Sequence, residues 1–537
     1  MSFVQAAPLL GNQYRDDALL RSYLRRALSA DTLSAIEPDL DALGQYAAEA
    51  WSAACACADE EPRLTHWDAW GNRVDHLELT RAWQAAAPLA ARYGLVAAGH
   101  EAAHGAAARV HQFSLLYLYH CASEFYSCPL AMSDGAATAI QASGNAELAA
   151  HALPHLLSRD PAQHWISGQW MTENTGGSDV SSSETTARLV DGQWRLYGRK
   201  WFTSAINAHM ALALARPESA PDGADGLALF YLEPRDTQNR WQHVRLDRLK
   251  HKLGTRELPT AEIHLDGAPA RLVAGADHGV RAIAPMLNVT RTWNAICAIA
   301  TMRRALALAE DYAQRRRAFG KALSEQPLHR ATLANLRAPF EAAFHFSFHV
   351  AELLGLARAG ETSETQRNRL RLLTPLAKLW TGKLAVAVVS ECCECFGGAG
   401  YLEDTGMPRL LRDAQVFSIW EGTTNVLALD FLRALRGAGG TQTLLDAQAE
   451  WHTQIESAEL ASCTQIAGEL AEKTATKLQS LANDRDALEA QARNLAFAFA
   501  QSLALSLQAR HADWALRNEN DGARVAAAQR FADLLTS

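Results

Sequence analysis

The apolar positions divide the chain into helical and strand-like stretches. From about residue 15 to 160 they recur at helical spacing, as in Ala106–Tyr119, and Pro129 is expected to end the long helix that follows. Near residue 165 the pattern changes to alternation, and Thr186–Tyr197 alternates around Asp191-Gly192, which is typical of a β-hairpin. Further strand candidates are Met210–Ala215, Leu227–Leu232 and Ala261–Leu265.

Helical periodicity returns at about residue 280 and continues to Arg436. Gly437–Gly440 is a predicted hinge, and the segment after it is helical again. We therefore predict an α+β fold with helical residues 1–160, a β domain over 161–278, a helical bundle over 279–437 and a C-terminal helical extension over 438–537. No Gly-x-Gly-x-x-Gly motif follows a strand, so a Rossmann dinucleotide site is not supported.

Composition narrows the functional class. A chain of 537 residues is too long for one hydrophobic core, and a net charge of −8 argues against nucleic acid or an anionic membrane as the main partner. No apolar run is judged long enough to span a bilayer, and the N-terminus lacks a basic leader. A cytoplasmic location without membrane association is therefore expected.

The nine cysteines are scattered and odd in number, which indicates reduced thiols rather than a disulfide framework. The cluster Cys392-Cys393-x-Cys395 suggests a metal site at first, but no partner pair with ligand spacing follows it. Because the cluster lies in an apolar helical run, buried core thiols are the favoured interpretation. We expect no metal.

The segment Ser418–Asn425 places a carboxylate, Glu421, on a glycine-containing loop directly before the apolar helical run Val426–Leu435. A carboxylate in such a place can be desolvated and act as a general base. Gly422–Asn425 can also turn backbone N–H groups toward an anion at the helix start. The alternative is a helix-end carboxylate favoured only by the helix macrodipole.

Two further motifs occur where helical sequence gives way to strands. In Met171–Val180, Gly176 and Gly177 allow close backbone approach, so this loop can hold a pyrophosphate or the edge of a flavin, or be only a turn. In Gly198–Ser204, two aromatic residues stand beside hydroxyl groups at a strand end, which ordinary sheet packing also explains.

Two more motifs lie in the second helical stretch. Arg315–Gly320, followed by Gln326, contains three successive arginines that suit the phosphates of a cofactor better than nucleic acid in an acidic protein. Phe396–Tyr401 is a glycine cluster at a helix end, and a C-cap with a turn would explain it equally well.

Taken together, the motifs resemble those of acyl-CoA dehydrogenases, in the same order and over about residues 90–437. The segment Trp67–Asp75 and the C-terminal extension are most similar to the AidB branch of that family. The matching residues are Thr172-Glu with Gly-Gly-Ser-Asp179, Lys200-Trp-Phe with Ser204, Arg316-x-x-Phe-Gly320 with Gln326, Gly397-Gly-x-Gly400 and Trp420-Glu-Gly-Thr423.

The resemblance implies a middle β-barrel between the helical domains, a bound FAD, and dehydrogenation of an acyl-CoA thioester to a trans-2-enoyl-CoA in fatty acid metabolism. Glu421 would remove the α-proton and hydride would pass to flavin N5, a task that requires a base with a raised pKa in a dry site. Thr290, at the position where some members carry their base, cannot replace it. The FAD contacts implied are Met171, Thr172, Gly177, Ser178, Phe202, Thr203, Ser204, Arg316, Gln326, Gly397, Gly398, Thr423 and Asn425. The substrate contacts implied are Ser178, Asn288, Arg291 and Trp420.

Three positions depart from the family pattern: Asn288 replaces a common aspartate, Glu394 a glutamine and Trp420 a tyrosine. The first and third leave acyl-CoA affinity and acyl chain length open. The resemblance also implies a homo-oligomer, either a homodimer or a dimer of dimers (homotetramer), in which a neighbouring subunit completes each FAD site through residues such as Arg316. An electron-transfer flavoprotein is the expected electron acceptor, with O₂ as the alternative.

A DNA-associated damage-response function like that of AidB is a competing hypothesis. Residues 441–537 carry eight basic and thirteen acidic residues, which is the wrong balance for a phosphate binder. Only Arg510, Arg517 and Arg524, at helical spacing, could form a local basic face. We therefore expect no DNA binding and prefer oligomer packing for the extension.

Overall fold

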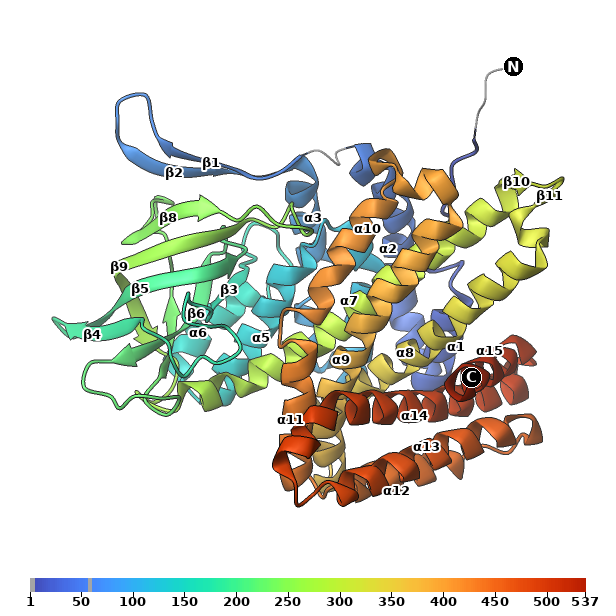
Figure 1. Cartoon of the computed structure of the whole chain (residues 1–537). Helices are drawn as coiled ribbons and strands as arrows, with labels where there is room; N and C mark the ends of the chain where they lie inside the picture. Colours follow the sequence, from blue (N-terminus) through green and yellow to red (C-terminus); the bar gives the residue numbers. More distant parts are fainter. Residues whose placement is uncertain (1–4, 57–59) are drawn as a thin grey trace. The chain divides into compact units, whose positions relative to one another are not determined.

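The computed structural model describes residues 5–56 and 60–537, and it separates into two compact units. The sheet unit comprises Cys57–His100 and Ser123–Thr290, and the helical unit comprises Met1–Ala56, Glu101–Ala122 and Arg291–Ser537. Cys57, one of the nine cysteines, lies outside the described residues. The ribbon in Figure 1 allows each unit to be followed by its labels.

The strands of the sheet unit close into a barrel. Strand β6 pairs with β4, β4 with β5, β5 with β9, β9 with β7, and β7 again with β6, so the ring of pairings is complete. This confirms the expected barrel. Strands β3 and β8 extend the sheet at β6 and β9. The strands are β3 (Ser167–Trp170), β4 (Thr186–Val190), β5 (Gln193–Ser204), β6 (Met210–Pro217), β7 (Ala228–Leu232), β8 (Val244–Leu249) and β9 (Thr260–Leu272).

The β4–β5 hairpin forms as the sequence predicted. Asp191 and Gly192 have φ of +52° and +78°, the left-handed pair that a two-residue hairpin turn requires. The inward-facing Trp194 packs edge-on against Phe230, with ring centroids 5.5 Å apart. The alternation expected at Leu189 is absent, because this side chain is 60% exposed near the tip of the hairpin. The other predicted strands correspond to β6, β7 and β9.

A second hairpin contradicts the helical expectation for residues 15–160. It consists of β1 (Arg63–Trp67) and β2 (Arg73–Glu78). The Asp68 carboxylate accepts hydrogen bonds from the N–H groups of Trp70 and Asn72, both at 2.8 Å, and Gly71 has φ of +83°. This Asx-type turn is a local signal that helical periodicity in the flanking sequence concealed.

The helices of the sheet unit are α3 (Arg81–Arg92), η1 (Ala97–Gly99), α5 (Ser127–Ser143), α6 (Ala146–Leu156) and the beginning of α7 (Gly279–Arg315). The prediction that Pro129 ends a helix was wrong. Pro129 lies in the first turn of α5, where backbone N–H groups have no intrahelical acceptor, so a proline is tolerated there.

The helical unit is built around aromatic contacts between distant segments. Tyr23 of α1 packs against Phe344 of α8, and Tyr117 of α4 packs against the same ring, each with centroids 5.5 Å apart. Its long helices are α1 (Ala18–Ala27), α2 (Ala30–Ala56), α4 (Ala108–Tyr119), the rest of α7, α8 (Pro327–Ala359), α9 (Glu364–Cys395), α10 (Met407–Ala414) and α11 (Thr424–Gly437). Shorter elements are η2 (Ala102–Ala107), η3 (His120–Ala122), β10 (Arg317–Ala318), β11 (Lys321–Ala322), η4 (Leu323–Glu325), η5 (Gly397–Tyr401), η6 (Glu403–Thr405) and η7 (Gln415–Ser418).

Helix α9 corrects one expectation. By length and composition it is apolar enough to cross a membrane, although the sequence was judged to contain no such run. In the described structure 78% of its most apolar window is buried, which is typical of a core helix. Ser363 and Gln366 cap its start with a reciprocal pair of hydrogen bonds.

The C-terminal extension packs on its own chain. Gly439 and Gly440 have positive φ and form the turn that ends the preceding helix; a hinge at this turn stays a prediction. Arg524 then forms an ion pair at 2.6 Å with Glu341 of α8, and both side chains are largely buried. Figure 1 shows α13 and α14 running side by side. The extension comprises α12 (Gln442–His452), η8 (Ala458–Leu460), α13 (Ala461–Ser480), α14 (Arg485–Glu519) and α15 (Gly522–Thr536).

Candidate active site

The Glu421 loop connects η7 to α11 and has a left-handed backbone. Glu421 has φ of +56° and Gly422 has φ of +103°. A left-handed glutamate is uncommon and persists only when its surroundings hold it. Thr423 ends the loop as the N-cap of α11, its hydroxyl accepting the N–H of Val426 at 3.4 Å. Asn425 is exposed in the first turn of this helix.

Two cations hold this turn by consecutive carbonyl groups. Arg291 of α7 donates from Nε to the Glu421 carbonyl oxygen at 3.3 Å, and Lys378 of α9 donates from Nζ to the Gly422 carbonyl oxygen. Charge-assisted bonds are stronger than neutral ones, so two different helices fix the position of the base. Sequence reasoning missed Lys378, whose only signal is a lysine within an apolar stretch of α9.

Asp430 of α11 forms ion pairs with two arginines, one of which is the Arg291 that holds the loop. Its carboxylate accepts from Arg291 Nη1 and from Arg371 Nη2, each at 2.7 Å. Burial alone would raise the pKa of Asp430, but the hydrogen bond from Arg371 and the charge of Arg291 lower it overall. Asp430 therefore stays ionised and balances part of the positive charge.

Trp420, immediately before the base, is fixed by one buried amide. Its indole Nε1 donates to Asn294 Oδ1 at 2.9 Å, while Asn294 Nδ2 donates to the Phe417 carbonyl oxygen at 2.9 Å. Asn294 is 3% exposed, and both ends of its amide are therefore used within the loop. The orientation of this half-buried indole is set by α7.

Helix α9 approaches the loop closely because residue 382 is glycine. An added Cβ at Gly382 would lie 2.7 Å from the Phe417 carbonyl oxygen, closer than carbon and oxygen can pack. The absence of a side chain therefore allows η7, and the Glu421 loop after it, to lie directly on the helix.

In the sheet unit, a buried ion pair holds the loop that begins at Met171. Lys200 Nζ donates to Glu173 Oε1 at 2.6 Å and to the Leu214 carbonyl oxygen at 2.8 Å, and the Thr185 hydroxyl donates to the same carboxylate. Burial alone would raise the pKa of Glu173, but the charge and hydrogen bond of Lys200 lower it overall. Burial lowers the pKa of Lys200.

The loop leaves its glycines open to a ligand. The Trp201 N–H donates to the Thr172 carbonyl oxygen at 2.9 Å, and an added Cβ at Gly177 would lie 2.9 Å from Thr172 Cγ2. Thr172 and Gly177 are thus adjacent, while Met171 is buried and Gly177 and Ser178 are exposed. This arrangement offers bare backbone to an approaching cofactor.

The three predicted cofactor residues at the end of β5 differ in how exposed they are. Phe202 is 47% exposed. Thr203 is fully buried within the β5–β9 ladder and its hydroxyl donates to the Ala261 carbonyl oxygen. Ser204 is half-buried, with its hydroxyl 3.1 Å from that of Thr260. Phe202 is therefore the side chain of this strand that is available to a planar ring.

Three predicted cofactor residues gather at the far ends of α7 and α9. The rings of Tyr312 and Phe396 stack there with centroids 4.3 Å apart. Arg316 follows one turn after Tyr312, and Gly397 and Gly398 directly follow Phe396 and are exposed.

A short turn beside them completes this end of the helical unit. Gln326 donates from Nε2 to the Ala318 carbonyl oxygen at 3.1 Å and so closes the β10–β11 turn. Large apolar side chains here face solvent: Phe319 is 98% exposed, Leu328 82% and Tyr401 92%. Such exposure is typical of a surface that a partner covers.

The two groups of the helical unit are far apart. At about 1.5 Å rise per residue, Lys378 and Phe396 on α9 are separated by roughly 27 Å, and Arg291 and Tyr312 on α7 by roughly 32 Å. Within one chain, Glu421 and Arg316 therefore lie at opposite ends of these helices and do not share one site. Asn288 is half-buried on α7, in the part that belongs to the sheet unit.

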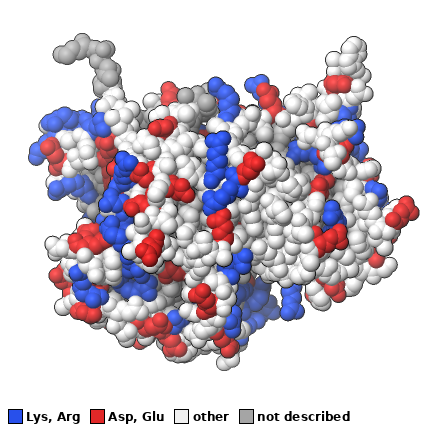
Figure 2. Space-filling model, turned by 180° about the vertical axis from the view of Figure 1, so that it is seen from behind, with Lys and Arg blue, Asp and Glu red and all other residues white. Residues whose placement is uncertain are grey.

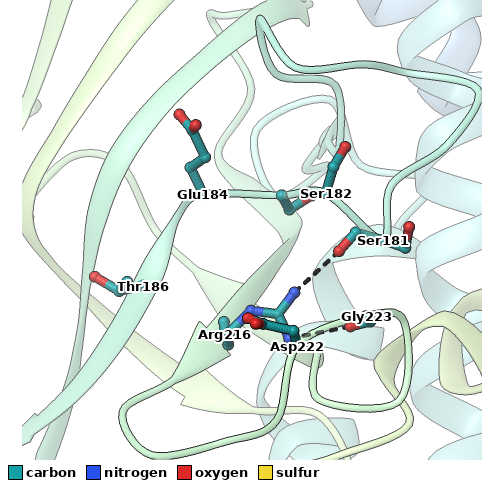
Figure 3. Close-up of a pocket in the computed structure, with 8 residues that line it drawn as sticks. Ser181, Ser182, Glu184, Thr186, Arg216, Asp222 and Gly223 are labelled. Atoms are coloured by element: carbon teal, nitrogen blue, oxygen red, sulfur yellow. Dashed lines mark hydrogen bonds between the residues drawn. The ribbon is translucent and has the colours of Figure 1, made fainter.

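A cavity of about 430 Å³ opens elsewhere in the sheet unit, beside the loop at Ser181 (Figure 3). Arg216 points into it and donates to the carbonyl oxygens of Ser181 and Gly223, both at 3.0 Å. The guanidinium thus joins two loops, and the lining residues include no predicted cofactor or substrate contact.

The cysteine cluster shows no metal chemistry. Cys392 is buried and Cys393 and Cys395 are half-buried, and burial raises the pKa of each of the latter two thiols to about 11. Within residues 5–56 and 60–537, no three His, Cys, Asp or Glu side chains are grouped to hold a metal ion. The absence of a metal stays a prediction.

Comparison with known proteins places these elements in one family. Residues 168–268 match the description "Acyl-CoA dehydrogenase, middle domain", and residues 277–436 match "Acyl-CoA dehydrogenase, C-terminal domain". Acyl-CoA dehydrogenase family member 11 of Caenorhabditis elegans is 41% identical, over 97% of this chain and 87% of its own length. The chain belongs to the acyl-CoA dehydrogenase family.

The AidB resemblance is confirmed as well. Residues 5–161 match "Adaptive response protein AidB N-terminal domain". AidB of Escherichia coli K12 is 35% identical over 72% of this acyl-CoA dehydrogenase and 71% of its own length. The crystal structure of Caenorhabditis elegans ACDH-11 in complex with C11-CoA superimposes with a TM-score of 0.95 at 38% identity, covering 99% of this chain and 92% of that one. Family membership makes the chain an oxidoreductase.

Proposed function

We propose that this chain is an FAD-dependent dehydrogenase that converts an acyl-CoA thioester to the trans-2-enoyl-CoA, with Glu421 as the base. The observation that carries the proposal is the left-handed Glu421, whose own carbonyl and the next are each held by a cation. The similar ACDH-11 structure contains C11-CoA, which supports a CoA thioester as the substrate class.

The residues of the sheet unit fit a flavin. Gly177 and Ser178 present exposed backbone, Thr172 lies beside them, and Phe202 offers an exposed ring. The buried Glu173–Lys200 pair keeps this loop in place whether or not a ligand is bound. FAD, the cofactor of the family, would be held by these residues.

In the reaction, Glu421 accepts the α-proton and its backbone N–H serves as one donor to the thioester oxygen, where negative charge develops. Trp420, held by Asn294, forms a rigid wall next to the base and limits the space for the acyl chain. Arg291 holds the loop, in addition to the substrate contact that the resemblance implies. When bound, FAD supplies the acceptor for the hydride that leaves the β-carbon.

The separation of the two groups in the helical unit supports a homo-oligomer. The Arg316 end lies roughly 30 Å along α7 and α9 from the base, too far for both to surround one reacting centre. The exposed Phe319, Leu328 and Tyr401 at that end support contact with another subunit. We propose that this end contributes to the FAD site of a neighbouring copy, in a dimer of dimers.

The electron acceptor and the location stay predictions. An electron-transfer flavoprotein is the proposed acceptor, and a cytoplasmic location is the proposed site of action. Oxygen consumption during turnover would instead indicate an oxidase.

The intramolecular contacts of three arginines weigh against the DNA-associated alternative. Arg517 pairs with Asp513 and Arg524 pairs with Glu341, each within 2.7 Å, while Arg510 is half-buried. The basic face that these arginines could have formed is thus largely neutralised by carboxylates of the same chain. On the face shown in Figure 2, basic and acidic side chains are interspersed. A gel shift at physiological salt should show no tight binding to DNA.

Anaerobic titration of the purified holoenzyme tests the proposal. We expect butanoyl-, octanoyl-, dodecanoyl- or hexadecanoyl-CoA to bleach the flavin absorbance, and Glu421→Gln to retain FAD but to bleach at least about 10³-fold more slowly, since general-base catalysis contributes on this scale. Glu472→Gln, on an exposed face of α13, is the matched control and should bleach at the wild-type rate. Bleaching by none of the thioesters, or an active Glu421→Gln, would contradict the proposal.

A further inference from the structure

Lys378 is a buried cation whose role the dehydrogenase reaction does not yet explain. Its side chain lies on α9 with 1% of its surface exposed. In the described structure its ammonium makes one hydrogen bond, to the Gly422 carbonyl oxygen, and it forms no ion pair within 4 Å. A buried ammonium without a paired carboxylate is costly, so its presence beside the base calls for a functional reason.

We propose that Lys378 is a positioning residue for Glu421, holding the Gly422 carbonyl and favouring the ionised, proton-accepting form of the glutamate. The inference rests on the proposed function, in which Glu421 is the base. Lys378 acts on the reaction only through that residue, because its hydrogen bond goes to the loop backbone.

The electrostatic surroundings of Lys378 support this role. Burial lowers the pKa of Lys378 to about 7, the charge of Glu421 raises it, and the charge of Arg291 on α7 lowers it. Arg291 in turn forms an ion pair with Asp430 of α11, and Asp430 also pairs with Arg371 of α9. Attraction between Lys378 and Glu421 is mutual, so below about pH 7 the protonated lysine stabilises the carboxylate.

The same contact fixes geometry. Gly422 follows the left-handed Glu421, and its carbonyl points to α9 while the Glu421 carbonyl points to Arg291 of α7. Removing the lysine releases one of the two restraints on the turn. The charge and the restraint can be separated by substitution, because glutamine retains a donor without charge and arginine retains both.

The test is the pH profile of anaerobic flavin reduction by the holoenzyme, with whichever of butanoyl-, octanoyl-, dodecanoyl- or hexadecanoyl-CoA bleaches the wild type fastest. At low pH the rate falls as Glu421 becomes protonated, and this part of the profile is its acid limb. In Lys378→Gln and Lys378→Met, we expect the acid limb to lie at least about one pH unit higher than in the wild type, so that at a pH below the limb the variant reacts about tenfold more slowly. Lys378→Arg should return the limb toward its wild-type position. Lys383→Gln, a half-buried lysine on the same helix, is the matched control and should leave the limb unchanged.

A purely structural role predicts something different: a rate lowered equally at every pH, with the limb in place. If that result is found while the wild type bleaches and Glu421→Gln is inactive, the proposed function stands and only this inference is overturned. A wild type that no thioester bleaches overturns the proposed function and this inference with it. Because Lys378 already loses its proton near pH 7, neutral replacements should fold and retain FAD. If flavin content and circular dichroism show that both neutral variants are unfolded, Lys378 is structural and the inference is wrong.

Discussion

Two loops of this protein are each held by a buried lysine, and the two lysines differ in what they bond. Lys200 reaches the Glu173 carboxylate and the Leu214 carbonyl, and the carboxylate also receives the Thr185 hydroxyl. Lys378 reaches only the Gly422 carbonyl and feels Glu421 through space.

The difference distinguishes a lysine that is bonded to a carboxylate from one whose charge changes with pH. In the Glu173–Lys200 pair the ammonium bonds a carboxylate directly, and this contact holds the loop at Met171. The charge of Lys378 depends on pH because burial lowers its pKa to about 7, and it depends on Glu421 because the charge of that residue raises the same pKa. A cofactor loop benefits from constancy, whereas a proton-accepting loop benefits from a neighbour that responds to the proton.

The largest effect should come from breaking the Glu173–Lys200 pair. Glu173→Ala leaves Lys200 buried without its carboxylate, and we expect a loss of about 3–5 kcal/mol in the free energy of unfolding. Chemical denaturation followed by circular dichroism measures it. Glu184→Ala, a neighbouring glutamate whose side chain lies outside this pair, serves as the control, and equal stability of the two variants would contradict the comparison.

The next effect is a pH dependence at Lys378. Its pKa is lowered from 10.5 to about 7 in the folded chain. As pH falls from 10.5 to about 7, Lys378 takes up a proton in the unfolded chain before it does so in the folded chain. Its contribution to the free energy of unfolding therefore decreases toward pH 7, by at most about 1.4 kcal/mol per pH unit.

In Lys378→Met this contribution is absent. The difference in unfolding free energy, variant minus wild type, should therefore grow as pH is lowered from about 9.5 to 7. Urea titrations at several pH values measure it, and Lys383→Met gives the background. A difference independent of pH would show that Lys378 is not the titrating group.

The smallest effect should follow from Gly382→Ala. Replacing a helix-interior glycine with alanine usually stabilises by roughly 0.5–1 kcal/mol. Here the added Cβ would meet the Phe417 carbonyl, so we expect a loss of about 1–3 kcal/mol and a displaced Glu421 loop. Thermal unfolding and the bleaching rate measure the two consequences. Gly468→Ala on α13, where an added Cβ meets no atom within 4 Å, should instead stabilise.

Sequence reasoning succeeded where local patterns decide structure. The Asp191-Gly192 hairpin, the strands of the barrel and the glycine turn after α11 all depend on residues close together in sequence. It failed at Pro129, because a proline both ends helices and begins them, and only the position of the neighbouring helix distinguishes the two. It missed the β1–β2 hairpin because the surrounding helical signal was stronger.

The sequence by itself determined the family of this protein and the identity of its candidate base, because motif residues and their order survive without knowledge of contacts. Only the tertiary structure revealed what holds that base. Arg291, Lys378 and Asp430 come from α7, α9 and α11, and their meeting at one loop depends on helix packing rather than on spacing. Burial in that packing also sets the charge of Lys378, and no sequence pattern encodes burial of a single side chain.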